Sequence, residues 1–392
     1  MYIQYSLAYI AFFLVIVFLF LVESTSKNND LLCGKSLSIF SYATLFLVLN
    51  YFICCRGYVG SDVKAYYTFY QDTPTIFSSL SKFNNFFKSW NYEKGFSIYS
   101  IICKTLFRDS FLAFQFFNSA IDLIILHSCF KKYCKENYIF CWFFFSIFYG
   151  LYYEMYVLRN VKSIMIFFLS IQYIYDRRPL KFYLLNTLGL LFHSSTIFFM
   201  PMYFLAYLKR NKKIEISIFI IGNLLFLSGF SLTRELLLLM YGHLPSPYNG
   251  LVYGYVYGES FNNARGLSIG FLERDISFII FYLMIDDIAE KNKVDYLFWF
   301  LYLMYNFINL FFSDFVIIAD RVGSLFILSY WILYPKVYVR LNRERKLIFL
   351  FLFVVYGLLK FKSLYSADKF FYYENIFTGA LSPEDRFRLF IK

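Results

Sequence analysis

Long apolar runs recur along the whole chain and limit the folds that it can adopt. Runs of about 18 or more apolar residues can cross a bilayer as a helix, and here they alternate with short basic turns. Because 59% of the residues are hydrophobic and only 16% are charged, no soluble domain fits between the runs. We therefore expect an all-α polytopic membrane protein, with about 10–12 transmembrane helices in a single membrane domain over residues 1–392.

Basic turns orient these helices, because short cytoplasmic loops are rich in Lys and Arg. The four most basic turns are KKYCKEN (131–137), DRRPLK (176–181), KRNKK (209–213) and RLNRERK (340–346). The first apolar run, residues 1–23, lacks a basic start and a small-residue cleavage pattern, so we interpret it as a transmembrane helix. The orientation predicts an outer loop at 56–109, an outer loop at 233–267 and an external tail at 362–392.

Two stretches do not fit a simple alternation of spans. The apolar part of 93–108 covers only about half of the hydrocarbon core, which predicts a re-entrant or interfacial helix. Residues 182–208 lie between two basic turns, and a single crossing would place one of those turns outside. We expect instead a broken-helix hairpin whose two short helices meet near His193, because such breaks are tolerated where the backbone lines a cavity.

This topology gathers ionisable residues at one membrane boundary. Charged side chains at membrane depth are costly, and they are functional by default. Those at or near the outer boundary are Arg56, Asp62, Glu93, Arg159, His193, Arg265, Asp314, Asp320 and Arg321. The cytoplasmic side has only short basic turns, so any chemistry is expected on the outer face.

Cations near this boundary could hold a lipid diphosphate. Arg159 lies just inside a predicted span, with Lys162 nearly one turn later, and a guanidinium offers a planar fork of donors to phosphate oxygens. Lys162 could equally reach the headgroups or pair with Glu154. Arg321 could be a second diphosphate ligand or form a structural pair with Asp320.

The remaining polar candidates could supply a base or bind sugars. His193 could act as base, proton shuttle or hydrogen-bond donor, although it could also be a satisfied polar residue inside the bundle. Glu93 opens the short helix and could simply complement its dipole. Asp62, Tyr66 and Tyr70 would share one face of a helix. That face could bind a sugar, or it could belong to an ordinary aromatic loop.

No motif in the sequence indicates a cofactor or a metal. The P-loop, GxGxxG, HExxH, EF-hand and DxD-like patterns are missing from plausible contexts. The seven cysteines show neither CxxC pairs nor metal-ligand spacing, so we interpret them as apolar packing residues. A nucleic-acid partner is also excluded, since no basic stripe lies on a soluble face.

The ordered set of these residues resembles the EpsG-like group of Wzy-type polysaccharide polymerases over most of the chain. The resemblance rests on the blocks Arg56…Gly60-x-Asp62…Tyr66, Glu93-x-Gly95-Phe96, Arg159 with Lys162, Phe192-His193-Ser194-Ser195, and Arg321. Lys94 stands where the family often has Pro, and Asn160 stands where it often has Gln. Both departures leave the neighbouring charged residue in place.

The resemblance implies a membrane glycosyltransferase that polymerises repeat units linked to undecaprenyl diphosphate into O-antigen, capsule or exopolysaccharide. Such enzymes lie in the bacterial inner membrane, act at its outer face, and can work with a chain-length regulator protein. The expected site follows from the blocks above. The diphosphate and sugar ligands would be Arg159, Lys162, Arg321, Arg56, Tyr66 and Asp320, and the base would be His193, Asp62 or Glu93.

Three other functions fit part of the pattern. An O-antigen ligase would use the same kind of donor. A non-enzymatic flippase of lipid-linked oligosaccharide also needs cations for the diphosphate, but internal repeats and a central charged cavity, which would be expected of it, are missing from the sequence. A membrane acyltransferase could use His193, although nothing indicates an acyl-donor site.

Overall fold

The computed structural model describes residues 3–26, 32–258, 266–289, 294–367 and 369–391. These residues form helices, turns and loops, with one isolated antiparallel bridge between Arg56 and Asn375. The predicted all-α class is therefore confirmed. Arg265 lies outside the described residues. Where the sequence predicts one membrane domain, the chain forms two compact units, Met1–Ile197 with Tyr334–Lys392, and Phe198–Leu333.

Among the described residues, five helices are long and apolar enough to cross a membrane. They are Gln4–Thr25, Ser36–Cys54, Phe111–Tyr133, Val294–Phe311 and Arg343–Ser366. The number is up to seven if each of two bent pairs, Lys212–Ser228 with Leu232–Met240 and Ala319–Phe326 with Leu328–Arg340, is one span. The multi-pass prediction is confirmed. The number of about 10–12 crossings stays a prediction, since helices such as Tyr138–Ile147 are short for a complete span.

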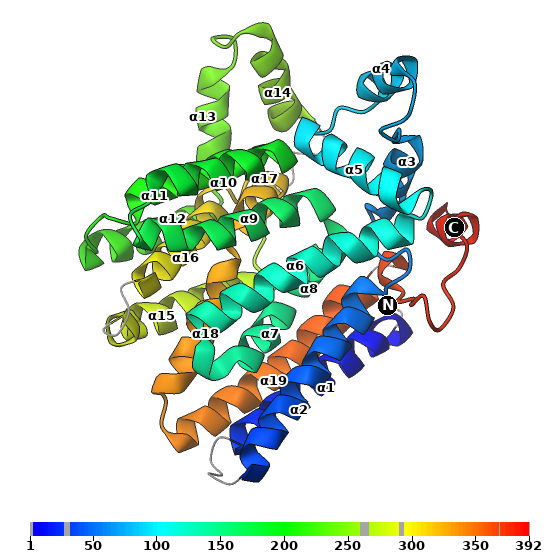
Figure 1. Ribbon diagram of the computed structural model, residues 1–392. Coiled ribbons are helices and arrows are strands. Elements are labelled where there is room, and N and C mark those ends of the chain that lie inside the picture. Colours follow the sequence, from blue (N-terminus) through cyan, green and yellow to red (C-terminus); the bar gives the residue numbers. More distant parts are fainter. Residues whose placement is uncertain (1–2, 27–31, 259–265, 290–293, 368, 392) are drawn as a thin grey trace. The chain divides into compact units, whose positions relative to one another are not determined.

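The first unit contains helices α3–α5 (Figure 1), and most of the candidate residues belong to it. Its helix α1 packs against α2, α7 and α19, and α9 packs against α6 and α10. The helices are α1 (Ile3–Ser26), α2 (Leu32–Leu49), a π-helical turn (Asn50–Cys54), α3 (Val63–Asp72), α4 (Leu80–Ser89), α5 (Lys94–Phe107), α6 (Phe111–Tyr133), α7 (Tyr138–Ile147), α8 (Gly150–Tyr156), α9 (Leu158–Tyr175), α10 (Pro179–Phe192), α19 (Arg343–Ser366) and α20 (Pro383–Ile391).

The second unit is organised around α16, which packs against α12, α15 and α17. Its basic turn near 209–213 is held by Arg210, which pairs with Glu215 and Asp286. Its helices are α11 (Met202–Leu205), α12 (Lys212–Ser228), α13 (Leu232–Met240), α14 (Ser246–Tyr257), α15 (Ile269–Ala289), α16 (Val294–Phe311) and α17 (Val316–Gly323), followed by α18 (Leu328–Arg340), which continues into the first unit.

Helices also occur where the sequence predicts an outer loop. Within 233–267 the described residues form most of α13 and all of α14. Leucine is a strong helix former, and the run Leu236–Leu239 lies in α13. The helix start is capped from a distance, because Asp314 accepts hydrogen bonds from the backbone N–H groups of Thr233 and Arg234. The sequence around α13 does not reveal this cap, because Asp314 is distant in the chain.

The short helix and the helix break both lie where they are predicted. Helix α5 covers 14 residues, too few to cross the hydrocarbon core. Helix α10 ends at Phe192, His193 is extended (φ −156°, ψ 128°), and a 3-10 helix follows over Ser194–Phe199. Thr196 reinforces the break, since its hydroxyl and its N–H both donate to the His193 carbonyl.

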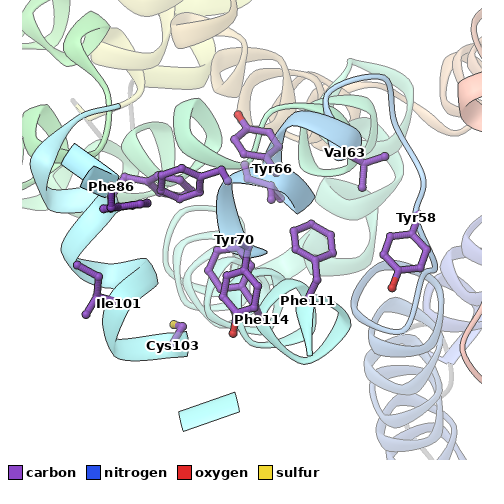
Figure 2. Close-up of a cluster of buried hydrophobic side chains, with 12 residues drawn as sticks. Tyr58, Val63, Tyr66, Tyr70, Phe86, Ile101, Cys103, Phe111 and Phe114 are labelled. Carbon is purple, nitrogen blue, oxygen red and sulfur yellow. The ribbon is translucent and has the colours of Figure 1, made fainter. Parts of the chain in front are cut away.

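Aromatic packing holds the helices α3–α5 together. Val63, Tyr66, Phe69 and Tyr70 lie on one face of α3 and belong to one buried cluster with Phe96. Figure 2 shows Val63, Tyr66 and Tyr70 in that cluster with Tyr58, Phe86, Ile101, Cys103, Phe111 and Phe114. Burying an aromatic or large aliphatic side chain stabilises a fold by about 1.5–3 kcal/mol. The cluster therefore makes 56–109 a folded layer of helices, and it brings Tyr66 and α5 together.

Candidate functional site

Glu93 joins Arg159 to the loop that carries His193. One carboxylate oxygen forms an ion pair with Nη1 of Arg159, and the other accepts a hydrogen bond of 3.0 Å from the backbone N–H of Ser194. Because Ser194 directly follows His193, one acidic side chain brings the guanidinium and the imidazole loop to the same place. Three separately predicted site residues are thus neighbours.

A close contact between α5 and α10 positions this carboxylate. A Cβ atom on Gly95 would lie 2.5 Å from Cβ of Leu191 and 2.6 Å from its carbonyl oxygen, so only glycine allows the two helices to approach so closely. Glu93 immediately precedes α5, and His193 immediately follows α10. The contact therefore explains the Glu-x-Gly spacing. Lys94, the departure from the family pattern, is exposed.

Aromatic groups also hold the guanidinium of Arg159. Its Cζ lies 3.9 Å from the ring centre of Tyr92, a cation–π geometry, and the Tyr66 hydroxyl interacts with it. Burial raises the pKa of Tyr66 to about 12, so this hydroxyl is neutral and its oxygen can accept from the guanidinium. The positive charge is thereby fixed in direction while remaining partly exposed.

The loop before α3 explains how Tyr66 reaches this position. Gly60 has φ +112°, and a Cβ atom there would lie 2.6 Å from the carbonyl oxygen of Met155. Glycine is therefore required both for the backbone conformation and for the close approach to α8. Asp62 follows at the start of α3, where it is partly exposed and accepts a hydrogen bond from Ser61.

The aromatic face predicted to bind a sugar is largely used for packing. Tyr70 is fully buried, and its hydroxyl donates to the carbonyl of Arg108. Tyr66 is buried too, and its hydroxyl interacts with Arg159. Of the predicted set Asp62, Tyr66 and Tyr70, Tyr66 therefore contacts the Arg159 charge, Asp62 is partly exposed at the start of α3, and Tyr70 is a core residue.

His193 is held by the 3-10 turn that follows it. Its Nδ1 lies 2.6 Å from Oγ of Ser195 and 3.3 Å from the Ser195 backbone nitrogen. Ser195 Oγ also donates to the side-chain oxygen of Asn160 at 3.3 Å. Asn160 follows Arg159 in α9, so the imidazole loop is tied to the arginine helix a second time.

The electrostatics of Glu93 favour its charged form. Burial by itself would raise its pKa, but the Arg159 guanidinium and the Ser194 N–H hold the pKa of this carboxyl below its usual value. A carboxylate with a depressed pKa is a weak base. Glu93 is therefore better suited to orienting Arg159 and the His193 loop than to removing a proton.

Lys162 lies one turn beyond Arg159 but is directed into the core. Its Nζ forms an ion pair of 2.7 Å with Asp122 and donates to the carbonyl of Asn118 at 2.9 Å. The predicted alternative of a pair with Glu154 is wrong, because neither carboxylate oxygen of Glu154 has a hydrogen-bond partner among the described residues. Lys162 therefore acts as a structural cation here.

Arg56 is likewise buried and bonded to protein groups. Its guanidinium donates to Oγ of Ser119 at 2.9 Å, to the carbonyl of Glu154 at 3.0 Å and to the carbonyl of Ile53. The residue is 1% exposed. These contacts tie the segment after α2 to α6 and α8, so the Arg56 guanidinium is bonded to protein groups inside the first unit.

Asp320 and Arg321 lie in α17 of the second unit, where both are exposed. Their predicted part in substrate binding stays a prediction. In the described part of the chain, no group of three or more His, Cys, Asp or Glu side chains is placed to hold a metal ion.

Three contributors to these contacts were missed by the sequence reasoning. Asp122 interrupts a predicted span, and an acidic residue at that depth is itself a signal of a functional or paired group. Tyr92 precedes Glu93, and Asn160 follows Arg159. No local pattern distinguishes these two from other polar or aromatic neighbours, since their roles depend on contacts between distant helices.

The fold and these contacts define a class: an all-α multi-pass membrane protein with a partly exposed charged cluster, built from the Arg159, Glu93 and His193 segments. The family model of the EpsG family matches residues 39–375. Since that match covers most of the chain, the protein belongs to the EpsG family, a family of Wzy-like polymerases. Comparisons with curated proteins and with solved structures give no significant match.

Proposed function

We propose that the protein polymerises undecaprenyl-diphosphate-linked repeat units into a surface polysaccharide at the outer face of the bacterial inner membrane. The observation that carries the proposal is the link Arg159–Glu93–Ser194, which fixes a cation beside an imidazole loop. A lipid-diphosphate donor requires both groups, because charge develops on the leaving diphosphate while the acceptor hydroxyl loses a proton.

The reaction follows from these roles. The acceptor hydroxyl oxygen forms a bond to the anomeric carbon of the donor sugar, and the bond from that carbon to the diphosphate oxygen breaks. The electron pair goes to the diphosphate, whose charge Arg159 stabilises. His193 takes the hydroxyl proton at Nε2, which requires the tautomer whose Nδ1–H donates to Oγ of Ser195. Glu93 stays ionised and orients both partners.

The other predicted ligands have different roles in this proposal. Lys162 and Arg56 act through the structure, since both are buried against protein acceptors. Tyr66 interacts with Arg159, and Asp62 lies one turn before it at the start of α3, so both are proposed to contact the first sugar of the donor. Arg321 remains the predicted second diphosphate ligand, with Asp320 beside it.

The test is the surface polysaccharide of a deletion strain complemented with single variants. Wild type should restore the ladder of long chains, whereas Arg159→Ala and His193→Ala should leave a single repeat unit on the acceptor at normal protein level. Arg178→Ala, in an exposed basic turn, is the matched control and should restore the ladder. A full ladder with either site variant would remove that residue from the mechanism. Loss of all capping in the deletion strain would indicate a ligase or flippase instead.

A further inference from the structure

The C-terminal segment packs against the loop that leads into α3, and a buried arginine holds it there. Arg386 in α20 is fully buried. Its guanidinium donates to the carbonyls of Tyr58 (3.0 Å), Phe370 (3.2 Å) and Tyr372 (2.8 Å), and it pairs with Glu374 at 3.1 Å. The sequence predicts an external tail from residue 362. That location stays a prediction; residues 369–391, named here the C-terminal clamp, are folded against other segments of the first unit.

The clamp grips the loop that leads into α3. Gly57 N–H donates to the Glu374 carbonyl at 2.8 Å, Gly60 N–H donates to the Phe370 carbonyl at 2.9 Å, and Ile376 N–H donates to the Cys55 carbonyl at 2.9 Å. A Cβ atom on Gly57 would lie 2.9 Å from Cβ of Glu374. Glycine is therefore needed for this approach.

Aromatic contacts also connect the clamp to α3 itself. The ring of Phe387 meets Tyr58 at 5.9 Å and Tyr67 at 5.4 Å in edge-to-face geometry. Tyr66, the neighbour of Tyr67, interacts with Arg159. A continuous path of contacts thus runs from Arg386 through the 57–60 loop and α3 to the site cation.

We propose that the C-terminal clamp is a positioning element of the site, with Arg386 as its anchor and Tyr66 as its point of action on Arg159. The idea rests on the proposed function. The family match ends at residue 375, so the clamp's anchoring helix lies beyond it. Arg386 is a positioning residue, since it touches neither substrate nor Arg159 in the proposed mechanism.

The experiment compares Arg386→Ala with Arg388→Ala, using purified full-length protein in liposomes and a purified undecaprenyl-diphosphate-linked repeat unit. Arg388 lies on the same helix, is exposed, and forms its ion pair within that helix, with Asp385. Because misplacing a site group by about 1 Å can cost on the order of a hundredfold in rate, we expect Arg386→Ala to lower kcat/KM at least tenfold. Arg388→Ala should match wild type.

A double-variant cycle separates positioning from general damage. If Arg386 acts through Tyr66, then Arg386→Ala combined with Tyr66→Phe should be no slower than the slower single variant. Multiplied effects would overturn that route. Arg386→Lys should recover part of the activity, because it retains the charge beside Glu374 but loses the planar fork.

Two further variants decide the matter if Arg386→Ala does not accumulate. Gly57→Ala and Glu374→Gln disturb the same contact without removing the arginine, and each should lower kcat/KM several-fold in folded protein. Full activity of Arg386→Ala would overturn the positioning role. Full activity of both Gly57→Ala and Glu374→Gln would overturn it too. Absence of polymer from wild type in the same assay would overturn the proposed function instead, so the two failures are distinguishable.

Discussion

Two cations on α9 lie one turn apart and have opposite surroundings. Lys162 and its partner Asp122 are 5% and 0% exposed, whereas Arg159 and its partner Glu93 are 20% and 19% exposed. The first pair connects α9 to α6 inside the bundle. The second connects α9 to the start of α5 and, through Ser194, to the His193 loop.

The difference shows what each charge can do. A buried ion pair without access to a ligand is a structural contact, and removing one partner leaves an uncompensated charge in the core. A partly exposed pair keeps its charge where an anionic group can approach. Of the two cations on α9, Lys162 therefore stabilises the fold, and Arg159, in our proposal, binds the substrate.

The largest expected effect is on the buried pair. Lys162→Met leaves Asp122 charged and unpaired, which should destabilise the protein by roughly 3–5 kcal/mol. Thermal unfolding in detergent measures this loss. Adding Asp122→Leu should restore most of the stability, because an apolar pair of similar size replaces the ion pair. A single Lys162→Met variant as stable as wild type would contradict the structural role.

The next effect concerns activity rather than stability. Arg159→Ala should reduce the polymerisation rate about a hundredfold or more, the loss typical of removing a group that stabilises developing charge. Its unfolding temperature should change little, since Glu93 is partly exposed and keeps the Ser194 hydrogen bond. Rates in liposomes and unfolding in detergent test the two parts separately. A strongly destabilised but active variant would reverse the comparison.

Acid should weaken the exposed pair through Glu93. Its pKa lies below the usual value, so its stabilising contribution is present above the unfolded pKa, near 4.3. That contribution is lost as pH falls through the lower folded pKa. We expect the stability advantage of wild type over Glu93→Gln to shrink on acidification from about pH 5 downward. An advantage that is constant between pH 7 and pH 3 would contradict the assignment.

The smallest effect is expected at Tyr92. Replacing the ring with Tyr92→Leu removes a cation–π contact of about 0.5–2 kcal/mol, so binding of the donor should weaken roughly two- to thirtyfold. Tyr92→Phe retains the ring face and should resemble wild type. Donor titration of the three proteins provides the comparison, and equal affinity in the leucine variant would show that the ring does not orient Arg159.

Much of the fold could be predicted because hydropathy and charge act locally. Apolar length predicted the membrane helices, and the basic turns around His193 predicted a helix break there. The helices α13 and α14 and the clamp could not be predicted in this way. The cap from Asp314 on α13 and the contacts of Arg386 with the 57–60 loop join segments that are distant in the chain.

Each site residue could be predicted from the sequence by itself, but the contacts between these residues could not. Arg159, Glu93 and His193 each stand out as ionisable groups near a boundary, yet the link between them depends on how closely Gly95 lets α5 approach Leu191. Lys162 remained a possible diphosphate ligand beside Arg159, because spacing along a helix does not reveal which side faces the core. Asp122 on α6 decides that, and it was overlooked.

The most direct test of this account compares the two pairs in one assay. The kcat/KM for a purified lipid-diphosphate-linked repeat unit would be measured for Arg159→Lys and for the double variant Lys162→Met with Asp122→Leu. We predict at least a tenfold loss for Arg159→Lys, because the planar fork is lost, and near wild-type values for the double variant. Wild-type activity in Arg159→Lys with loss in a stable double variant would place the substrate cation at Lys162 and contradict the account.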